Sequence, residues 1–152
     1  MKAAILSLLL AVAFVAIPAA YATSVFSELT PTKLNASGFK FDFTHERLPD
    51  GTIKFRVRIT ETTSKFNSSS STSLSVVQIT EHSRAVRDGR RLDSQREGNS
   101  LVCTFTVDNS AITERDLCFV FAQGAESVID GKLVPMPSID FVYARLQDFA
   151  RR

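Results

Sequence analysis

The sequence has few of the side chains that carry out catalysis or hold metal ions. It contains two histidines and two cysteines. His45 and His82 each stand beside a glutamate, but neighbouring residues of a strand point to opposite faces, so neither pair predicts a catalytic dyad. No zinc-protease, nucleophile-elbow or phosphate-loop motif is present, and no three or four metal ligands cluster. We therefore predict a protein without enzymatic activity, metal or cofactor; a small hydrolase with two carboxylates across a cleft is the less favoured alternative.

The sequence also lacks a strong charge of either sign. Lysine and arginine total 18 and aspartate and glutamate total 16, which gives a formal net charge of +2. Such a balance gives no reason to expect nucleic acid or an anionic membrane as the partner. We therefore consider a protein or a glycan as the partner, and the charge balance does not distinguish between them.

One long apolar run occurs, and it lies at the N-terminus. A short positive start precedes the apolar run 3–17, and the small residues Ala20 and Ala22 stand three positions and one position before a cut after Ala22. This is the layout of a secretory signal peptide. Pro18 interrupts the run before it reaches the roughly 20 apolar residues of a membrane span. We predict a signal peptide at 1–22 that is cut between Ala22 and Thr23, and a secreted, periplasmic or otherwise extracytoplasmic protein with no transmembrane segment in its mature chain.

Cleavage would leave a single domain, residues 23–152. It would remove Lys2, so 17 basic residues would stand against 16 acidic ones. A chain of this length buries roughly two-thirds of its unfolded surface and can fold around a core of its own. Asn35 and Asn67 fit the acceptor pattern for N-glycosylation, which matters only in a eukaryotic secretory pathway.

The predicted mature chain alternates between apolar and polar residues over many short stretches. Phe39, Phe41 and Phe43 share one face of such a stretch, and the alternation resumes after the turn at 48–51. A period of two residues predicts strands that are buried on one side. Several short strands between turns predict an all-β fold, a small antiparallel β-sandwich of about seven strands, with 146–152 as a frayed tail. We predict core strands at 39–45, 53–61, 74–80, 101–107, 117–122 and 139–145, and less clear strands near 25–30 and 128–134.

Residues 101–121 contain two apolar stretches joined by a polar corner that includes one apolar residue, Ile112. This arrangement resembles the crossing from strand E to strand F in immunoglobulin-like and fibronectin III-like domains. The resemblance implies an immunoglobulin-like or fibronectin III-like topology and implies no ligand. The chain departs from the immunoglobulin pattern because it has no tryptophan and because its two cysteines are much closer together in the sequence.

Cys103 and Cys118 lie in the two strands beside this corner. Because export favours oxidation of cysteine pairs, we predict a disulfide between them. A bridge that closes a loop of this size would stabilise the fold by about 3 kcal/mol in the chain-entropy model. The alternative is a pair of buried thiols that serve as small core residues.

The polar face of the hairpin 39–61 is locally basic. It carries Lys40, Lys54, Arg56 and Arg58, while the phenylalanines of the hairpin point to the other face. This face is either a platform for an anionic ligand or an ordinary solvated face of an antiparallel sheet. A nucleic-acid platform would normally place aromatic rings among the basic residues, so nucleic acid is not expected here.

Residues 81–99 form the most polar segment of the chain. Their turn signal, Asp88-Gly89, predicts a loop or a hairpin, and loops on rigid β-domains commonly carry binding sites. We predict a secreted module that binds a protein or a glycan, or adheres to one, through this segment or the basic hairpin face. A structural or assembly subunit of the cell envelope is the alternative. The predicted binding arginines of the segment are Arg84, Arg87, Arg90, Arg91 and Arg96.

Overall fold

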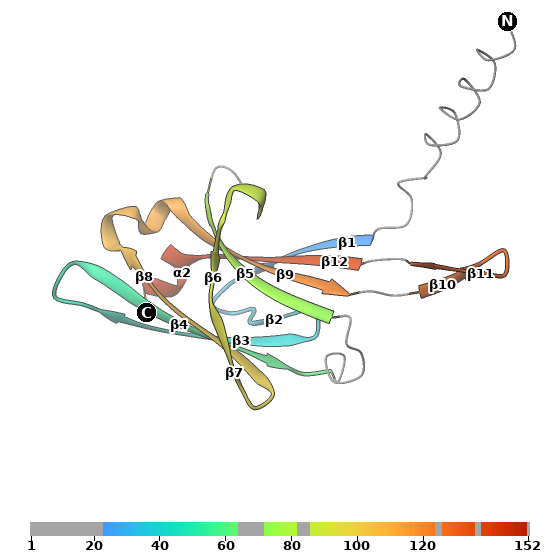
Figure 1. Cartoon of the computed structure of the whole chain (residues 1–152). Coiled ribbons are helices and arrows are strands. Elements are labelled where there is room, and N and C mark those ends of the chain that lie inside the picture. Colours follow the sequence, from blue (N-terminus) through green and yellow to red (C-terminus); the bar gives the residue numbers. More distant parts are fainter. Residues whose placement is uncertain (1–22, 64–71, 82–85, 124–125, 136–137, 152) are drawn as a thin grey trace, which may run out of the picture.

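The computed structural model describes residues 23–63, 72–81, 86–123, 126–135 and 138–151 (Figure 1). The predicted signal peptide, Asn67 and Arg84 therefore lie outside the described residues. Within those ranges, no helix is long and apolar enough to cross a membrane. The strands are β1 (Thr23–Leu29), β2 (Asn35–Ala36), β3 (Phe39–Arg47), β4 (Thr52–Glu61), β5 (Thr72–Thr80), β6 (Arg90–Leu92), β7 (Ser94–Glu97), β8 (Ser100–Asp108), β9 (Arg115–Gln123), β10 (Glu126–Ile129), β11 (Lys132–Pro135) and β12 (Ser138–Arg145). The helical segments are η2 (Val86–Asp88), η3 (Asn109–Glu114) and α2 (Leu146–Ala150).

The strands form two five-stranded sheets and one separate pair. The first sheet has the order β1-β12-β9-β5-β6, the second has the order β2-β3-β4-β8-β7, and β10 pairs with β11. Among the described strands, each pairing is antiparallel except that of β1 with β12. The predicted all-β, mostly antiparallel architecture is confirmed, and the two layers have the arrangement of a β-sandwich (Figure 1).

The hairpin of β3 and β4 follows from its alternating sequence and its turn. Phe41 pairs with Ile59 in register, and both side chains are buried. At the turn, the carboxylate of Asp50 accepts hydrogen bonds from the backbone N–H of Thr52 at 2.9 Å and from its hydroxyl at 2.7 Å. Gly51 has a φ of 84°, a left-handed conformation that costs glycine little because it has no Cβ. The predicted hairpin is therefore confirmed.

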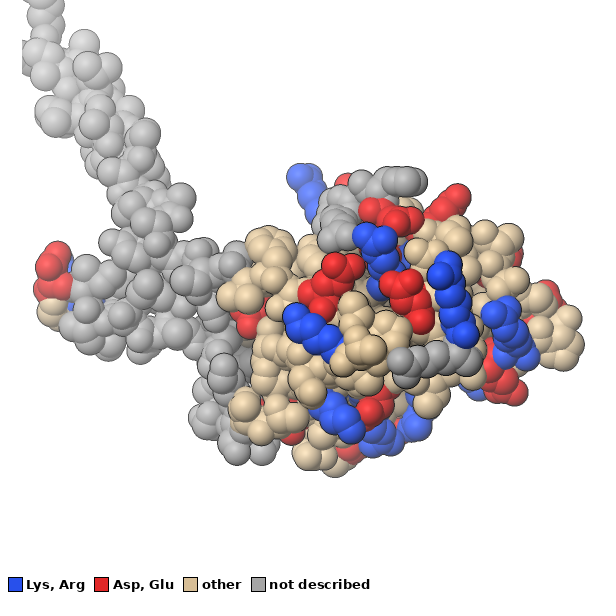
Figure 2. Space-filling model, turned by 180° about the vertical axis from the view of Figure 1, so that it is seen from behind, with Lys and Arg blue, Asp and Glu red and all other residues tan. Residues whose placement is uncertain are grey.

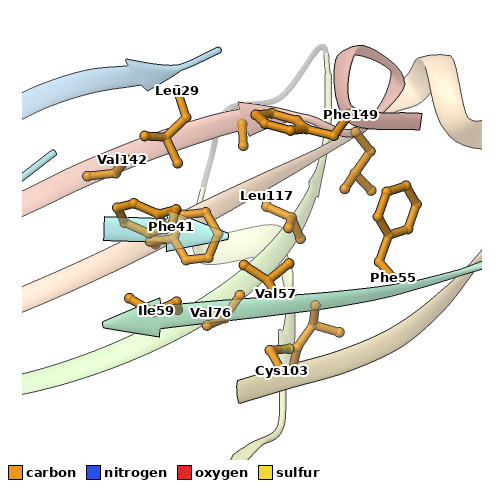
Figure 3. Close-up of a cluster of buried hydrophobic side chains, with 14 of the residues drawn as sticks. Leu29, Phe41, Phe55, Val57, Ile59, Val76, Cys103, Leu117, Val142 and Phe149 are labelled. Carbon is orange, nitrogen blue, oxygen red and sulfur yellow. The ribbon is translucent and has the colours of Figure 1, made fainter. Parts of the chain in front are cut away.

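The main hydrophobic core lies between the two sheets (Figure 3). Phe41 of the second sheet and Phe119 of the first sheet are completely buried, and their ring centroids lie 4.8 Å apart. The ring of Phe39 stacks on Phe121, with centroids 4.3 Å apart. Aromatic pairs thus join β3 to β9, and burial of this size is the dominant favourable contribution to folding.

A second apolar cluster lies on the opposite face of the first sheet. It is made by Val77, Ile79, Cys118 and Tyr143, with Val86, Val120 and Phe141 packed against it. The segment 86–89 lies on this cluster, because a Cβ built on Gly89 would meet the side chain of Val77 and would come within 2.7 Å of Ile79. Glycine is therefore required for the close approach of this segment to β5.

The two cysteines do not form the predicted disulfide. Both are buried free thiols, and they belong to different apolar clusters. Cys103 lies in the core between the sheets, whereas Cys118 belongs to the cluster on the far side of the first sheet. The reason is the alternation of β9, in which Leu117 and Phe119 fill the core and the residue between them must point away.

The C-terminal tail, which the sequence predicts to fray, forms α2 instead. Leu146, Phe149 and Ala150 of this helix are buried. The ring of Phe149 stacks on Phe43 with centroids 3.9 Å apart, and the Arg47 guanidinium donates a hydrogen bond to the Ala150 carbonyl at 3.4 Å. The helix therefore closes one end of the core.

Candidate functional site

The predicted basic face of β3 and β4 carries cations that are largely matched by carboxylates. Arg56 donates to both carboxylate oxygens of Glu97 at 3.1 and 3.2 Å, and Arg58 donates to the same carboxylate at 2.6 Å. Lys40 lies 3.3 Å from Asp42. Figure 2 shows the same mixing of signs over one side of the molecule, where blue and red side chains alternate. The paired charges make this face a poor platform for an anionic ligand.

The described part of the predicted binding segment, residues 86–99, crosses from the first sheet to the second. Its strand β6 pairs with β5 in the first sheet, and its strand β7 pairs with β8 in the second sheet. The chain changes sheets at Asp93. Most of the polar residues in the described part of this segment thus belong to two edge strands and the short η2 turn.

This crossing separates the predicted binding arginines. Arg87 is exposed on η2, whereas Arg96 is exposed on β7 and donates a hydrogen bond to the Gly98 carbonyl at 3.3 Å. Arg90 and Arg91 are both exposed on β6, and they line a common depression. Among the described arginines of this segment, these two are the pair that the fold brings to one site.

We call this depression the crossover groove. It has a volume of about 220 Å³ and a mainly polar lining. Arg90, Arg91, Asp93, Thr104 and Thr106 are exposed, whereas Leu92 is buried at its floor. Its lining residues are Gln78, Arg90, Arg91, Leu92, Asp93, Thr104, Phe105 and Thr106.

The crossover groove exists because β7 is much shorter than β8. The four residues of β7 pair only with Ser100–Cys103 of β8, although β8 continues to Asp108. Beyond Cys103, β8 is paired with β4 on one side, and among the described strands none pairs with its other side. Residues 104–106 therefore present an open strand edge in the wall of the groove, where backbone N–H and C=O groups can accept a further strand.

The side chains of the groove favour a ligand with negative charge. The lining contains two basic residues, Arg90 and Arg91, and one acidic residue, Asp93. Arginine presents a planar fork of donors that matches a carboxylate. Phe105 is half-buried and stacks on Phe55 with centroids 5.5 Å apart, which gives the groove a firm apolar wall. The arrangement can thus bind an extended acidic segment.

The described residues offer little reactive chemistry outside this groove. They contain no group of three or more His, Cys, Asp or Glu side chains placed to hold a metal ion. Burial raises the pKa of Cys103 to about 11, and the carboxylate of Asp93 adds to this effect. Burial likewise raises the pKa of Cys118 to about 11, against the opposing effect of a hydrogen bond with Tyr143. Both thiols are therefore protonated near neutral pH and are weak nucleophiles.

Sequence reasoning predicted binding in the segment that supplies one half of the groove lining and did not find the other half. Gln78, Thr104, Phe105 and Thr106 belong to predicted strands and carry no binding signal in the sequence. They come together because β6 adds to β5 while β7 leaves part of β8 uncovered, and both facts depend on long-range pairing. No known family model matches the chain, and no curated protein sequence matches it either.

Proposed function

We propose that the protein is a secreted binding module that recognises an extended acidic segment of another protein in the crossover groove. The observation that carries the proposal is the coincidence of the Arg90 and Arg91 pair with the open edge of β8. Each feature alone is common on β-domains. Together they favour a ligand that can pair its backbone with β8 and place negative charge beside the arginines.

The open edge of β8 supports strand addition as the mode of binding. A peptide that continues the line of β7 would pair with residues 104–106 through main-chain hydrogen bonds, which give affinity without regard to sequence. Alternate side chains of such a peptide would point toward β6, where the arginines lie. Carboxylates at those positions would form charge-assisted hydrogen bonds, which are stronger than hydrogen bonds between neutral groups.

The strand order supports an immunoglobulin-like topology, which we include in the proposal. The order β3-β4-β8-β7 corresponds to strands A-B-E-D, and the order β12-β9-β5 corresponds to G-F-C of such domains. Under this assignment the crossing from β8 to β9 is the E-to-F crossing. The proposal also includes export through a signal peptide at 1–22. A structural subunit of the cell envelope is the second candidate function, and the open edge of β1 favours it.

The test uses a short synthetic peptide of alternating glutamate and valine residues as the probe. We expect its titration to shift the backbone amide NMR signals of Thr104–Thr106 and to raise the fluorescence anisotropy of a labelled copy. The double variant R90E/R91E should weaken binding by roughly ten-fold or more, because two attractive contacts become repulsive. High salt should weaken the binding of the unchanged protein.

The matched control is R87E, which makes the same charge change on an exposed arginine of the same segment outside the groove. It should bind the probe as the unchanged protein does. Equal weakening by R87E would mean that net charge alone attracts the peptide. A sulfated oligosaccharide that binds through Arg90 and Arg91 without shifting the amides of Thr104–Thr106 would reject strand addition and point to a glycan ligand.

A further inference from the structure

The four outer edges of the two sheets differ in length and protection. The edge strands β2, β6 and β7 contain two, three and four residues, and all four residues of β7 are exposed and polar. The edge strand β1 contains seven residues. Proteins usually protect a long edge with charges, proline or a bulge because the open backbone can pair with another chain. The sequence of β1, Thr-Ser-Val-Phe-Ser-Glu-Leu, has no proline and a single charge.

Two large apolar side chains of β1 are exposed. Val25 is 50% exposed and Phe26 is 66% exposed, and these are the exposed large hydrophobic side chains among the described residues. The ring of Phe26 stacks on Phe141 of β12, with centroids 5.1 Å apart and planes 10° apart. The single charge, on Glu28, lies 3.5 Å from the Arg145 guanidinium. The outer edge of β1, with which no other described strand pairs, therefore carries an aromatic ring held in place by its neighbour.

We propose that β1 is a self-association edge, at which β1 of a second copy pairs antiparallel with a two-fold axis at Phe26. The two first sheets, of five strands each, would then become one continuous ten-stranded sheet. Two-fold dimers are the commonest oligomers, and their interface uses the same surface on both chains. This inference concerns a different surface from the crossover groove and does not depend on the proposed function.

The strand itself indicates a second copy as the occupant. Phe26 is the middle residue of Thr23–Leu29, so antiparallel pairing about it places the two Phe26 rings on one face, directly across from each other. Glu28 would face Ser24 of the other copy, and no like charges would be opposed. A shallow hollow of about 490 Å³, lined by Phe26, Ser27, Glu28 and Tyr143, adjoins the strand and can receive the second ring.

The first test measures association by analytical ultracentrifugation of the purified protein from about 1 µM to about 1 mM, a range that covers weak dimers. A single pair of strands makes a small interface, so we expect a reversible dimer at the upper concentrations. V25K places a charge on the edge, as natural edges do, and should weaken association by roughly ten-fold or more. F26K should have at least the same effect.

The matched control is Q95K, which adds the same charge to an exposed residue of the edge strand β7. It should leave association unchanged, and circular dichroism should confirm that all three variants keep the strand content of the unchanged protein. A chain that remains monomeric at about 1 mM would overturn the proposal. So would a dimer that Q95K disrupts and that V25K and F26K leave intact.

A second measurement tests the register. In a directly opposed pair of an antiparallel sheet the Cα atoms lie about 4.5–5.5 Å apart, within the range that a disulfide spans. F26C should therefore form a covalent dimer under mild oxidation, while the buried native thiols do not react. E28C should not, because its two copies would lie roughly 13 Å apart along the strands. Equal cross-linking of F26C and E28C would contradict the two-fold arrangement.

Discussion

The outer faces of the two sheets have opposite character. The outer face of the second sheet is polar, and Arg56 and Arg58 share the carboxylate of Glu97 across it. The outer face of the first sheet carries the apolar cluster around Val77 and Cys118, and the segment 86–89 covers part of it. The second sheet thus has one buried face, whereas the first sheet has two. The apolar outer face of the first sheet is partly covered, and among the described strands none pairs with the outer edge of β1.

The largest expected effect is on the reactivity of the two thiols, compared with that of an exposed cysteine. Each thiol lies in a different apolar cluster, so its reactivity shows whether that cluster is covered. Cys103 lies in the core and Cys118 in the outer cluster, and burial raises both pKa values to about 11. At about pH 8 we expect reaction with an aromatic disulfide reagent to be at least roughly a hundred-fold slower than for an exposed cysteine. The rate should rise as the pH approaches the raised pKa, because the thiolate is the reactive form.

The measurement counts thiols in the folded and the denatured protein. Two thiols should react in denaturant without prior reduction, which a disulfide would prevent. Rapid reaction of Cys118 alone in the folded protein would mean that the segment 86–89 does not cover the outer cluster.

The core between the sheets should give the largest change in stability. Phe41 and Phe55 are completely buried, so we expect Phe41→Ala or Phe55→Ala to lower the free energy of unfolding by about 3–5 kcal/mol. Lys40 points away from the core and is exposed, so Lys40→Ala should change it by less than about 0.5 kcal/mol. Urea denaturation measures both. A loss below about 1 kcal/mol at Phe41 would place that residue outside a packed core.

The segment 86–89, which covers the outer cluster, should contribute an intermediate amount to the free energy of unfolding. We expect Gly89→Ala to lower the free energy of unfolding by about 1–3 kcal/mol, because the new methyl group would press on Val77 and Ile79. Shortening Val77 removes one of the atoms that the methyl group would meet. The effects of Val77→Ala and Gly89→Ala should therefore be less than additive in a double-mutant cycle. Additive effects would mean that segment 86–89 does not contact β5.

The polar outer face of the second sheet should contribute least to the free energy of unfolding. The side chains of Arg56, Arg58 and Glu97 are 46%, 37% and 43% exposed, and exposed ion pairs are worth about 0.2–1 kcal/mol each. We expect Glu97→Gln to lower the free energy of unfolding by an amount in this range, less at high salt. A loss of stability larger than that caused by Gly89→Ala would mean that the polar outer face contributes more to stability than the covered apolar one.

The sequence was sufficient for the elements that depend on local patterns. The alternation of Phe39, Phe41 and Phe43 predicted one side of the core. The adjacent apolar pair Val76-Val77, within the predicted strand 74–80, departs from strict alternation. In the structure Val76 lies in the core and Val77 in the outer cluster, so both faces are covered. The apolar stretch 117–122 was predicted as a core strand, and β9 lies in the middle of its sheet.

The features that depend on long-range pairing were not predictable from local patterns. Cys103 and Cys118 lie on either side of one corner. Because side chains alternate along β9, Cys118 points away from the core and into the outer cluster. The tail residues Leu146 and Phe149 are buried only because the end of the core is open to receive them. The crossover groove depends on where β7 ends along β8, which no local pattern specifies.

A charge exchange in the crossover groove tests the proposed recognition of an acidic strand most directly. Its two arms are the unchanged protein and R90E/R91E, each titrated with the glutamate–valine peptide and with a matched lysine–valine peptide while the amides of Thr104–Thr106 are observed. We expect the unchanged protein to bind the first peptide and the double variant to bind the second, with the same amides shifted in both cases. Preference of both proteins for the same peptide, or shifts confined to other strands, would contradict the proposed site.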